Sequence, residues 1–183
     1  MSGGDADRDG DDVNAAGDGD DGTATLVADE DDWEAAVALR MAVFVDEQGV
    51  PEPLELDEHD EAPLESTVDH LLVRDAAGEA VAVARLRAVD AAAYGSEEAA
   101  HDDGRVAKVE RVAVARDRRG EGWGARAMRA AEDRARERDL PAVVLHAQTR
   151  AAGFYERLGY AVDDEVGAFE EDGIEHVRMR KRL

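Results

Sequence analysis

The stretch that decides the fold is RRGEGWG, residues 118–124. The residues before it, VERVAVARD, alternate as a strand does, and ARAMRAAEDRARERDL after it has the periodicity of a helix. Three alternating glycines leave the backbone N–H groups uncovered, and the helix start adds free N–H donors and the positive end of its dipole. Arg118 and Arg119 add fixed positive charge, so the corner suits a diphosphate. A plain turn is the alternative, but it explains one glycine more easily than three.

Two well-known phosphate-binding loops do not match this stretch. The Walker loop requires Gly-Lys-Ser/Thr at the helix start, where this chain has Gly124, Ala125 and Arg126. The dinucleotide fingerprint requires G-x-G-x-x-G, and GEGWG has its third glycine one place early. The loop therefore indicates a third kind of phosphate cradle.

The rest of the chain is strongly acidic. Its 183 residues contain 45 Asp and Glu against 22 Lys and Arg, a formal net charge of -23, and Lys108 and Lys181 are the two lysines. Such a charge argues against general binding to nucleic acid or to anionic lipid, because anion would meet anion. An acidic, lysine-poor surface favours a salt-loving source over an ordinary acidic protein, since salt screens the self-repulsion.

Composition also predicts where the chain works and where it folds. There is no cysteine, no apolar run long enough for a bilayer and no hydrophobic signal region, so a soluble, cytoplasmic protein is expected. Residues 1–22 contain eight Asp and six Gly and are predicted to be a disordered acidic tail. Calcium binding through DGDDG is the alternative, but this stretch lacks EF-hand spacing, and no metal site is predicted.

Residues 23–183 are predicted to form one α/β domain, with helices on both faces of a mixed central sheet of six to seven strands. Strands are expected at 23–28, 67–75, 79–90, 105–116, 141–148, 160–169 and 174–183. Helices are expected at 31–48, 125–140 and 149–159. The first helix is expected to be capped by Asp31 or Asp32 and to bury Trp33, Val37, Met41 and Phe44. Residues 49–66 form a Pro-broken acidic loop, and 91–104 form a polar excursion.

Two signatures in this order resemble those of the GCN5-related N-acetyltransferase (GNAT) superfamily, whose members bind acetyl-CoA. Arg119-x-x-Gly122-x-Gly124 resembles its pyrophosphate loop, and HAQTRAAGFYERLGY (146–160) is similar to its second signature. RMAVFVDEQGVP (40–51) and EEDGIEHVRM (170–179) are similar to segments of the ElaA-like branch. The resemblance covers about residues 33 to 181. Trp123 departs from the usual small aliphatic residue, and the tail and residues 91–104 have no counterpart.

The resemblance implies a cofactor site between two splayed parallel strands, here 105–115 and 142–148. Backbone groups of Val112 and Val114 would pair with the pantetheine arm, and the amides of residues 119–124 would hold the pyrophosphate. Gln148 stands where many relatives have Asn. The implied cofactor residues are Val112, Ala113, Val114, Arg119, Gly120, Glu121, Gly122, Trp123, Gly124 and Gln148.

The same resemblance places the candidate catalytic residues. Tyr155, facing the pantetheine sulfur, is the candidate acid for the leaving thiolate, or else a packing aromatic. Glu110 is either a base that works through water or a structural carboxylate paired with Arg85. His146 and His176 are each a candidate base or a structural group.

Glu47 and Gln48 end the first helix, where the superfamily places acceptor contacts. Glu47, Gln48 and His176 are the candidate substrate-binding residues. Glu47 and Gln48 could instead simply cap the helix. The expected function is direct transfer of an acetyl group from acetyl-CoA to a primary amine in a ternary complex. A non-catalytic acyl-CoA-binding module, and an acidic interaction domain using residues 52–65, are the alternatives. The resemblance also allows a homodimer.

Overall fold

The computed structural model describes residues 22–64, 67–100 and 103–183, so the predicted acidic tail lies outside the described residues except for Gly22. Within these ranges eight strands form one mixed sheet. The prediction of a mixed α/β sheet is confirmed, with more strands than expected because the stretch 160–169 contains parts of two short strands. The strands are β1 (Thr23–Leu26), β2 (Asp69–Arg74), β3 (Ala80–Asp90), β4 (Arg105–Val114), β5 (Ala142–Gln148), β6 (Ala161–Val162), β7 (Ala168–Glu171) and β8 (Ile174–Arg182).

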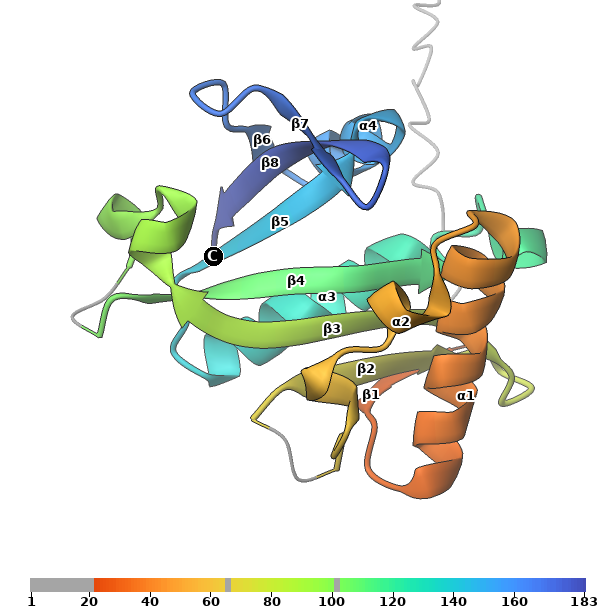
Figure 1. The fold of residues 1–183 in the computed structure, drawn as a ribbon. Coiled ribbons are helices and arrows are strands. Elements are labelled where there is room, and N and C mark those ends of the chain that lie inside the picture. Colours follow the sequence, from red (N-terminus) through yellow and green to blue (C-terminus); the bar gives the residue numbers. More distant parts are fainter. Residues whose placement is uncertain (1–21, 65–66, 101–102) are drawn as a thin grey trace, which may run out of the picture.

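The order across the sheet is β1-β2-β3-β4-β5-β8-β6, with β7 also paired to β8. All these pairs are antiparallel except β4 with β5, which are joined by a helical crossover. That parallel pair extends over two residue pairs only, Ala107 with Val143 and Lys108 with Val144. Beyond Lys108 the two strands part, and Figure 1 shows β5 and β8 turned away from β4.

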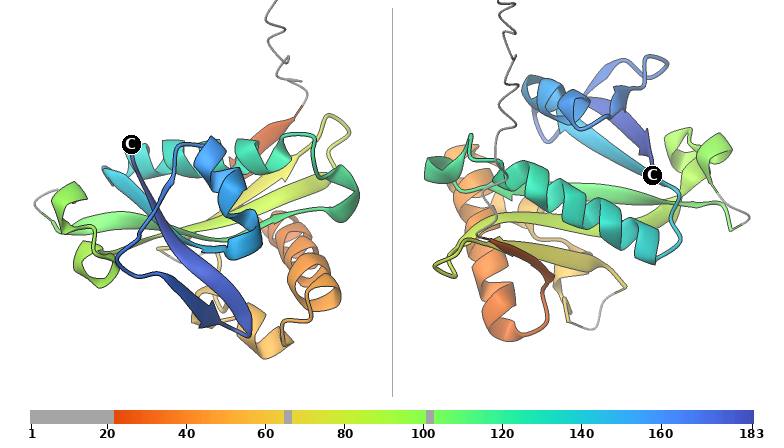
Figure 2. Two further views of the ribbon diagram at one scale, coloured as in Figure 1. Left: turned by 90° about the horizontal axis from the view of Figure 1, so that it is seen from above. Right: turned by 180° about the vertical axis from the view of Figure 1, so that it is seen from behind.

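Helices cover both faces of the sheet, as Figures 1 and 2 show. The helices are α1 (Glu30–Arg40), α2 (Glu52–Glu55), α3 (Trp123–Glu137) and α4 (Ala152–Arg157). The largest core cluster lies under α3, which contributes Ala127, Met128, Ala131 and Ala135. Small alanines let this helix lie close to the sheet, and Glu132 is the buried charged residue of the helix. A second cluster joins α1 to the opposite face.

Short helical turns connect these elements. They are the π-helical turn η1 (Met41–Glu47) and the 3-10 turns η2 (Glu58–Asp60), η3 (Ala91–Tyr94), η4 (Glu97–Ala99), η5 (Arg116–Arg118) and η6 (Thr149–Ala151). The turns η3 and η4 lie in the polar excursion, and η2 lies in the acidic loop.

The first helix differs from its prediction in three respects. Its cap is Asp29, whose side chain accepts a hydrogen bond from Asp32 N at 2.9 Å, so neither Asp31 nor Asp32 is the cap. The buried face consists of Ala36, Leu39 and Val43, while the four residues predicted for it are only partly buried. The last turns, Met41–Glu47, are π-helical, whereas the prediction had one regular helix over residues 31–48.

An irregularity in β4 lies at the point where the strands part. Between the pairs Arg85–Glu110 and Val83–Ala113, β4 contains one residue more than β3, which makes a bulge. Arg111 in this bulge has φ 54°, which is uncommon for a residue with a side chain. The bulge bends β4. On the α1 face of the sheet, Glu110 pairs with Arg85 of β3, and Arg111 donates to the backbone carbonyl of Leu54.

Candidate active site

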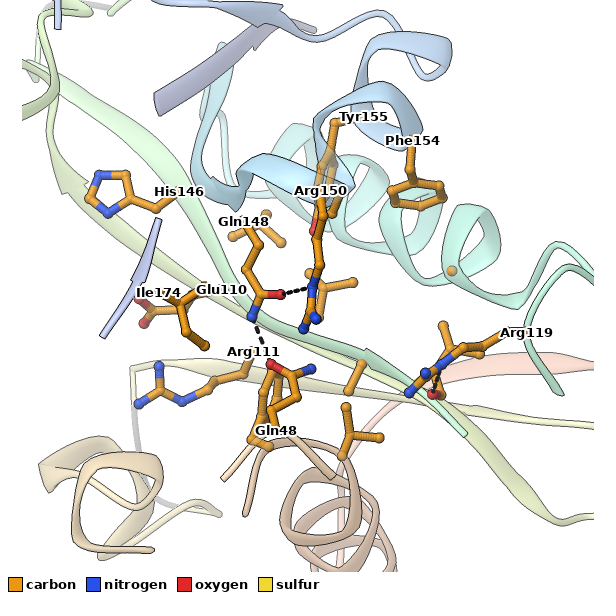
Figure 3. Close-up of a pocket in the computed structure, with 18 of the residues that line it drawn as sticks. Gln48, Glu110, Arg111, Arg119, His146, Gln148, Arg150, Phe154, Tyr155 and Ile174 are labelled. Atoms are coloured by element: carbon orange, nitrogen blue, oxygen red, sulfur yellow. Dashed lines mark hydrogen bonds between the residues drawn. The ribbon is translucent and has the colours of Figure 1, made fainter. Parts of the chain in front are cut away.

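A cavity of about 900 Å³ occupies the gap between β4 and β5. Side chains enter it from η1, β4, β5, α4 and β8, and Figure 3 shows ten of them labelled. In this view Arg119 lies at one end, Gln148 and Tyr155 in the middle, and His146 at the other end. The cavity therefore brings together residues that are far apart in the sequence.

The open edge of β4 forms one wall of this cavity. The Nε of Arg119 donates to the carbonyl oxygen of Val114 at 3.3 Å, so this carbonyl points away from β3. Alternation along the strand places the backbone groups of Val112 on the same edge. Ala113, between them, pairs with Val83 of β3. Backbone groups without a neighbouring strand need another partner, and an extended ligand can supply one.

The glycines of the loop 118–124 have two different roles. Gly120 and Gly122 have φ of +83° and +92°, values that a side chain would strain. Gly124 is needed for packing, because a Cβ there would lie 3.2 Å from Phe154 and 3.3 Å from Val114. The first hydrogen bond of α3 runs from Arg126 N to Gly122 O at 3.0 Å. The N–H groups before it are therefore open to an anion.

Arg119 is held by an ion pair across the mouth of the pocket. Its two terminal nitrogens donate to the carboxylate of Glu47 at 2.6 and 2.8 Å. This hydrogen bond is the main cause that lowers the pKa of Glu47. Glu47 was predicted to contact the acceptor or to cap the first helix, and in the structure its carboxylate pairs with Arg119 of the loop 118–124.

Trp123 begins α3 and is surrounded by charged groups. Its Nε1 donates to Glu121 at 2.8 Å, and the guanidinium groups of Arg118 and Arg126 lie 5.4 and 5.8 Å from its ring. Arg118 is itself bound to Glu121 and to the turn between β2 and β3. Gly22, where the described chain begins, accepts a hydrogen bond from Arg126. The loop is thus held by the turn between β2 and β3, and the first turn of α3 is held by Gly22.

Tyr155 enters the cavity from α4. Its ring packs edge-on against the rings of Phe154 and Tyr160, with 4.8 and 5.9 Å between the ring centroids. Burial raises its pKa to about 12, and none of the described residues hydrogen-bonds to its hydroxyl. A protonated phenol that faces a cavity can donate a proton there.

A chain of side-chain hydrogen bonds crosses the middle of the pocket. The Nε2 of Gln148 donates to Gln48 at 2.7 Å, and the Oε1 of Gln148 accepts from Arg150 at 2.9 Å (Figure 3). The end of the first helical segment is therefore joined to the end of β5. Both glutamines line the cavity and contact each other across it.

Glu110 is surrounded by cations. Its carboxylate lies 2.9 Å from Arg85, 2.7 Å from Arg87 and 3.0 Å from Lys108. Burial by itself would raise the pKa of Glu110, but the charges of Arg85, Lys108 and Arg87 outweigh it and lower the pKa to about 2. Such a carboxylate is a weak base. The contacts favour the structural one of the two roles considered for this residue.

The two histidines occupy neighbouring strands at the far end of the pocket. His146 lies on β5 and His176 on β8, and both line the cavity. The Nδ1 of His176 lies 2.8 Å from Ile174 O, and its ring stacks on Phe169. The Nδ1 of His146 lies 3.2 Å from the carboxylate of Glu171 on β7.

Several residues of the pocket were not predicted from the sequence. They are Lys108, Arg111, Arg150, Phe154 and Glu171. Arg150 and Phe154 lie inside the second quoted signature, and Glu171 lies inside the segment 170–179 quoted for the ElaA-like branch, so each could have been found there. Arg111 could not, because its position depends on the bulge in β4.

Metal-binding clusters and membrane spans are both absent from the described ranges. No group of three or more His, Cys, Asp or Glu side chains there could hold a metal ion. No helix in that part of the chain has the length and apolar character of a membrane span.

A mixed sheet that opens at its parallel pair, with an anion-binding loop where the opened strand ends, is the architecture of an acyltransferase. The profile of the Acetyltransferase (GNAT) domain family matches residues 55–183, and the chain belongs to this family. The uncharacterized protein YyaT of Bacillus subtilis is 34% identical over 157 residues, which is 86% of this chain and 93% of that protein.

Two solved structures are similar over nearly the whole chain. An acyl-CoA N-acyltransferase from Pseudomonas aeruginosa is 29% identical, has a TM-score of 0.66 and matches over 88% of this chain and 98% of its own. ElaA from Escherichia coli is 26% identical, has a TM-score of 0.66 and matches over 87% of this chain and 97% of its own. The predicted fold and acetyltransferase family are thus confirmed, and ElaA is among the structural relatives, as the sequence signatures indicated.

Proposed function

We propose that the protein transfers the acetyl group of acetyl-CoA directly to a primary amine while both substrates are bound. The observation that carries this proposal is the shared pocket. One cavity contains the open edge of β4, the loop 118–124 and the buried hydroxyl of Tyr155. A diphosphate needs the loop, an extended amide chain needs the strand edge, and a thioester sulfur needs the hydroxyl.

The loop and the strand edge account for binding of the cofactor. Backbone N–H groups of residues 119–124 would hold the pyrophosphate, with Arg119 adding charge. The exposed backbone groups of Val112 and Val114 would accept the pantetheine amides as a neighbouring strand does. Arg119 would then exchange the carboxylate of Glu47 for a phosphate, because both anions compete for the same guanidinium group.

Tyr155 supplies the proton for the departing thiolate. The amine nitrogen attacks the thioester carbon, the carbon–sulfur bond breaks, and the phenol protonates the sulfur. Burial raises the pKa of Tyr155 to about 12, and the same burial raises the proton affinity of a thiolate beside it. Donor and acceptor therefore shift in the same direction, and positioning of the two substrates supplies much of the rate.

The acceptor enters at the end of the pocket away from Arg119. Gln48, which is bonded to Gln148 in the middle of the pocket, and His176, which pairs with Gln148 across β5 and β8, are proposed to contact it. Glu171 and Asp172 also line the cavity. A cationic amine is the substrate class that these carboxylates and the negative field of the whole chain attract.

Composition supports two further proposals about the setting. We propose that residues 23–183 are the catalytic domain and that it works in the salt-rich cytoplasm of a halophile, because a net charge of -23 needs screening. Turnover should therefore be higher in molar KCl than in dilute buffer, and a rate that falls steadily with added KCl would contradict the proposal.

The test of function combines titration with turnover. Calorimetric titration with acetyl-CoA in molar KCl should give a saturable heat, and a panel of amines should release free CoA. We expect spermidine, tyramine or a lysine-containing peptide to be acetylated. Binding without release of CoA by any amine would indicate an acyl-CoA-binding module, and absence of binding would remove the proposal altogether.

A further inference from the structure

We propose that His146 is the base that takes the proton of the attacking amine, and that Glu171 positions its imidazole. The proposal rests on the N-acetyltransferase function and names the proton acceptor of the same pocket. His146 lines the cavity two residues before Gln148. Figure 3 shows it at the opposite end from Arg119, so it lies away from the diphosphate loop.

The alternation of side chains along β5 determines the face of the sheet to which His146 points. Val143, Leu145 and Ala147 pack into the core under α3. Because side chains alternate along a strand, His146 and Gln148 point to the other face, where α1 lies. Tyr155 belongs to the core on the α3 side. The phenol and the imidazole thus approach the gap from opposite faces, as a donor at the sulfur and an acceptor at the amine must.

The imidazole is held in a single orientation. Its Nδ1 lies 3.2 and 3.4 Å from the two oxygens of Glu171, and its ring contacts Tyr94 at 5.8 Å and Phe169 at 4.8 Å. A carboxylate beside Nδ1 favours the tautomer with a proton there, which leaves the Nε2 lone pair as the proton acceptor. No hydrogen bond within the described part of the chain uses Nε2. The hydrogen bond to His146 is the main cause that lowers the pKa of Glu171, so this carboxylate stays ionised.

The other charged groups near this ring are engaged elsewhere. Lys108 on β4 is paired with Glu110 at 3.0 Å. On β8, Arg178 is paired with Asp163 at 2.6 Å, and His176 bonds through Nδ1 to a backbone carbonyl. Glu110, the carboxylate at the same level of β4, is held by its three cations. Among these groups the imidazole is the best placed to accept a proton from the amine.

Bonds and protons balance in the proposed acetyl transfer. A neutral amine forms the bond from nitrogen to the acetyl carbon, and the bond from that carbon to sulfur breaks. Nε2 of His146 takes the N–H proton, and Tyr155 gives its proton to the thiolate. A proton passing through solvent from the imidazolium to the phenolate restores both side chains, and the products are the acetamide and CoA.

Turnover of matched variants tests the role of His146. In His146→Gln, kcat with acetyl-CoA and spermidine, or the best amine of the panel, should fall by about 100-fold or more. The Kd for CoA should stay unchanged. Added imidazole should restore part of the rate of His146→Ala, which a structural role would not produce. His59→Gln changes a histidine outside the pocket and should leave turnover unchanged.

Nitrogen NMR of the imidazole tests the pairing without any acceptor. The wild-type His146 should show the Nδ1–H tautomer, and Glu171→Gln should lose this preference while keeping CoA affinity. A wild-type Nε2–H tautomer would overturn the proposal, as would full kcat in folded His146→Gln. If CoA bound and no amine reacted, the proposed function would fail, while the NMR experiment would still decide whether Glu171 sets the tautomer.

Discussion

Tyr155 and Tyr160 show how position decides the role of one residue type. Both rings lie in the same core cluster, 5.9 Å apart. The hydroxyl of Tyr160 donates to Glu132 at 3.0 Å, while that of Tyr155 faces the cavity. The hydroxyl of Tyr160 therefore contributes to stability, whereas that of Tyr155 has no hydrogen-bond partner among the described residues.

The variant Tyr155→Phe removes the proton donor and keeps the ring. We expect kcat to fall by roughly one to three orders of magnitude, with Tm and the Kd for CoA unchanged. Tyr160→Phe is the matched control. It should lower Tm by breaking a buried hydrogen bond, worth about 1 kcal/mol, and leave kcat nearly unchanged. Equal turnover of Tyr155→Phe and the wild type would show that the thiolate departs without this acid.

Side-chain pairing was the least predictable feature at this scale. The residue types of Glu110 and Glu47 were evident, and the pairing of Glu110 with Arg85 followed from the neighbouring strands. The partner of Glu47 did not follow, because Arg119 is 72 residues away and meets it only through the fold. Alternation along β5 could have placed His146 on the outer face, but not its contact with Glu171 on β7.

Cofactor affinity is expected to depend on the loop 118–124. Replacing Gly122 by Val introduces a branched side chain at a φ of +92° and covers the N–H groups at the start of α3. The Kd for CoA should rise by about tenfold or more, which is ~1.4 kcal/mol. Gly78→Val, at a φ of +87° in the turn between β2 and β3, carries similar strain away from the pocket. Titration calorimetry should show normal CoA affinity in this control and weaker affinity in the loop variant.

The turn η1 supplies a competitor for the same loop. Glu47→Gln removes the anion that occupies Arg119, so CoA should bind more tightly, on the order of twofold to fivefold in dilute buffer. Molar KCl should remove most of this gain, because salt screens exposed charges. Asp46→Asn is the matched charge control and should have little effect. Weaker binding in Glu47→Gln would mean that the carboxylate holds Arg119 in its binding position.

Most elements followed from the sequence, and the exceptions have physical causes. The strands around the hairpin, the crossover helix and the loop were predictable from periodicity and glycine spacing. The π-helical turn was not, since its hydrogen-bond pattern leaves no composition signal. The bulge at Arg111 was also hidden, because an extra residue in one strand is visible only against its partner.

A network of buried charges attaches residues 52–60 to the sheet. Arg40 pairs with Glu55 and Asp60, and Arg85 pairs with Asp57, Asp60 and Glu110. Both arginine side chains are 2% exposed. Breaking such pairs on one side leaves a buried charge alone, at a cost of about 3–5 kcal/mol. The network therefore makes the stability of the whole domain sensitive to pH.

The direction of this pH dependence follows from the pKa shifts. Burial opposes ionisation, but the arginine contacts outweigh it and lower the pKa values of Asp57, Asp60 and Glu110, the last to about 2. Their stabilisation is present above the ordinary carboxyl range near pH 4 and is lost as pH falls towards 2. The pKa of Glu55 is raised by burial, so the contribution of this residue is lost as pH rises above the ordinary Glu range and opposes the trend there.

We therefore expect Tm in molar KCl to fall steeply between about pH 4 and 2. Glu110→Gln should be less stable at pH 7 by about 3 kcal/mol and should show a flatter acid limb. Glu58→Gln changes an exposed carboxyl of the same segment and should follow the wild-type curve. Thermal unfolding followed by circular dichroism would measure all three, and parallel curves for wild type and Glu110→Gln would contradict the assignment.

The short parallel contact between β4 and β5 divides the sheet into two parts, here called leaves. One leaf contains β1 to β4 and the other contains β5 to β8, and their backbones pair directly at two residue pairs, while the core under α3 and the Gln48–Gln148 hydrogen bond join their side chains. Such leaves can open separately by local unfolding, and amide hydrogen exchange should then be faster in β5 and β8 than in β3. A ligand lying between them as an extra strand would bind both leaves at once. Saturating CoA should slow exchange mainly in the second leaf, so that during turnover the substrate becomes part of the framework that holds it.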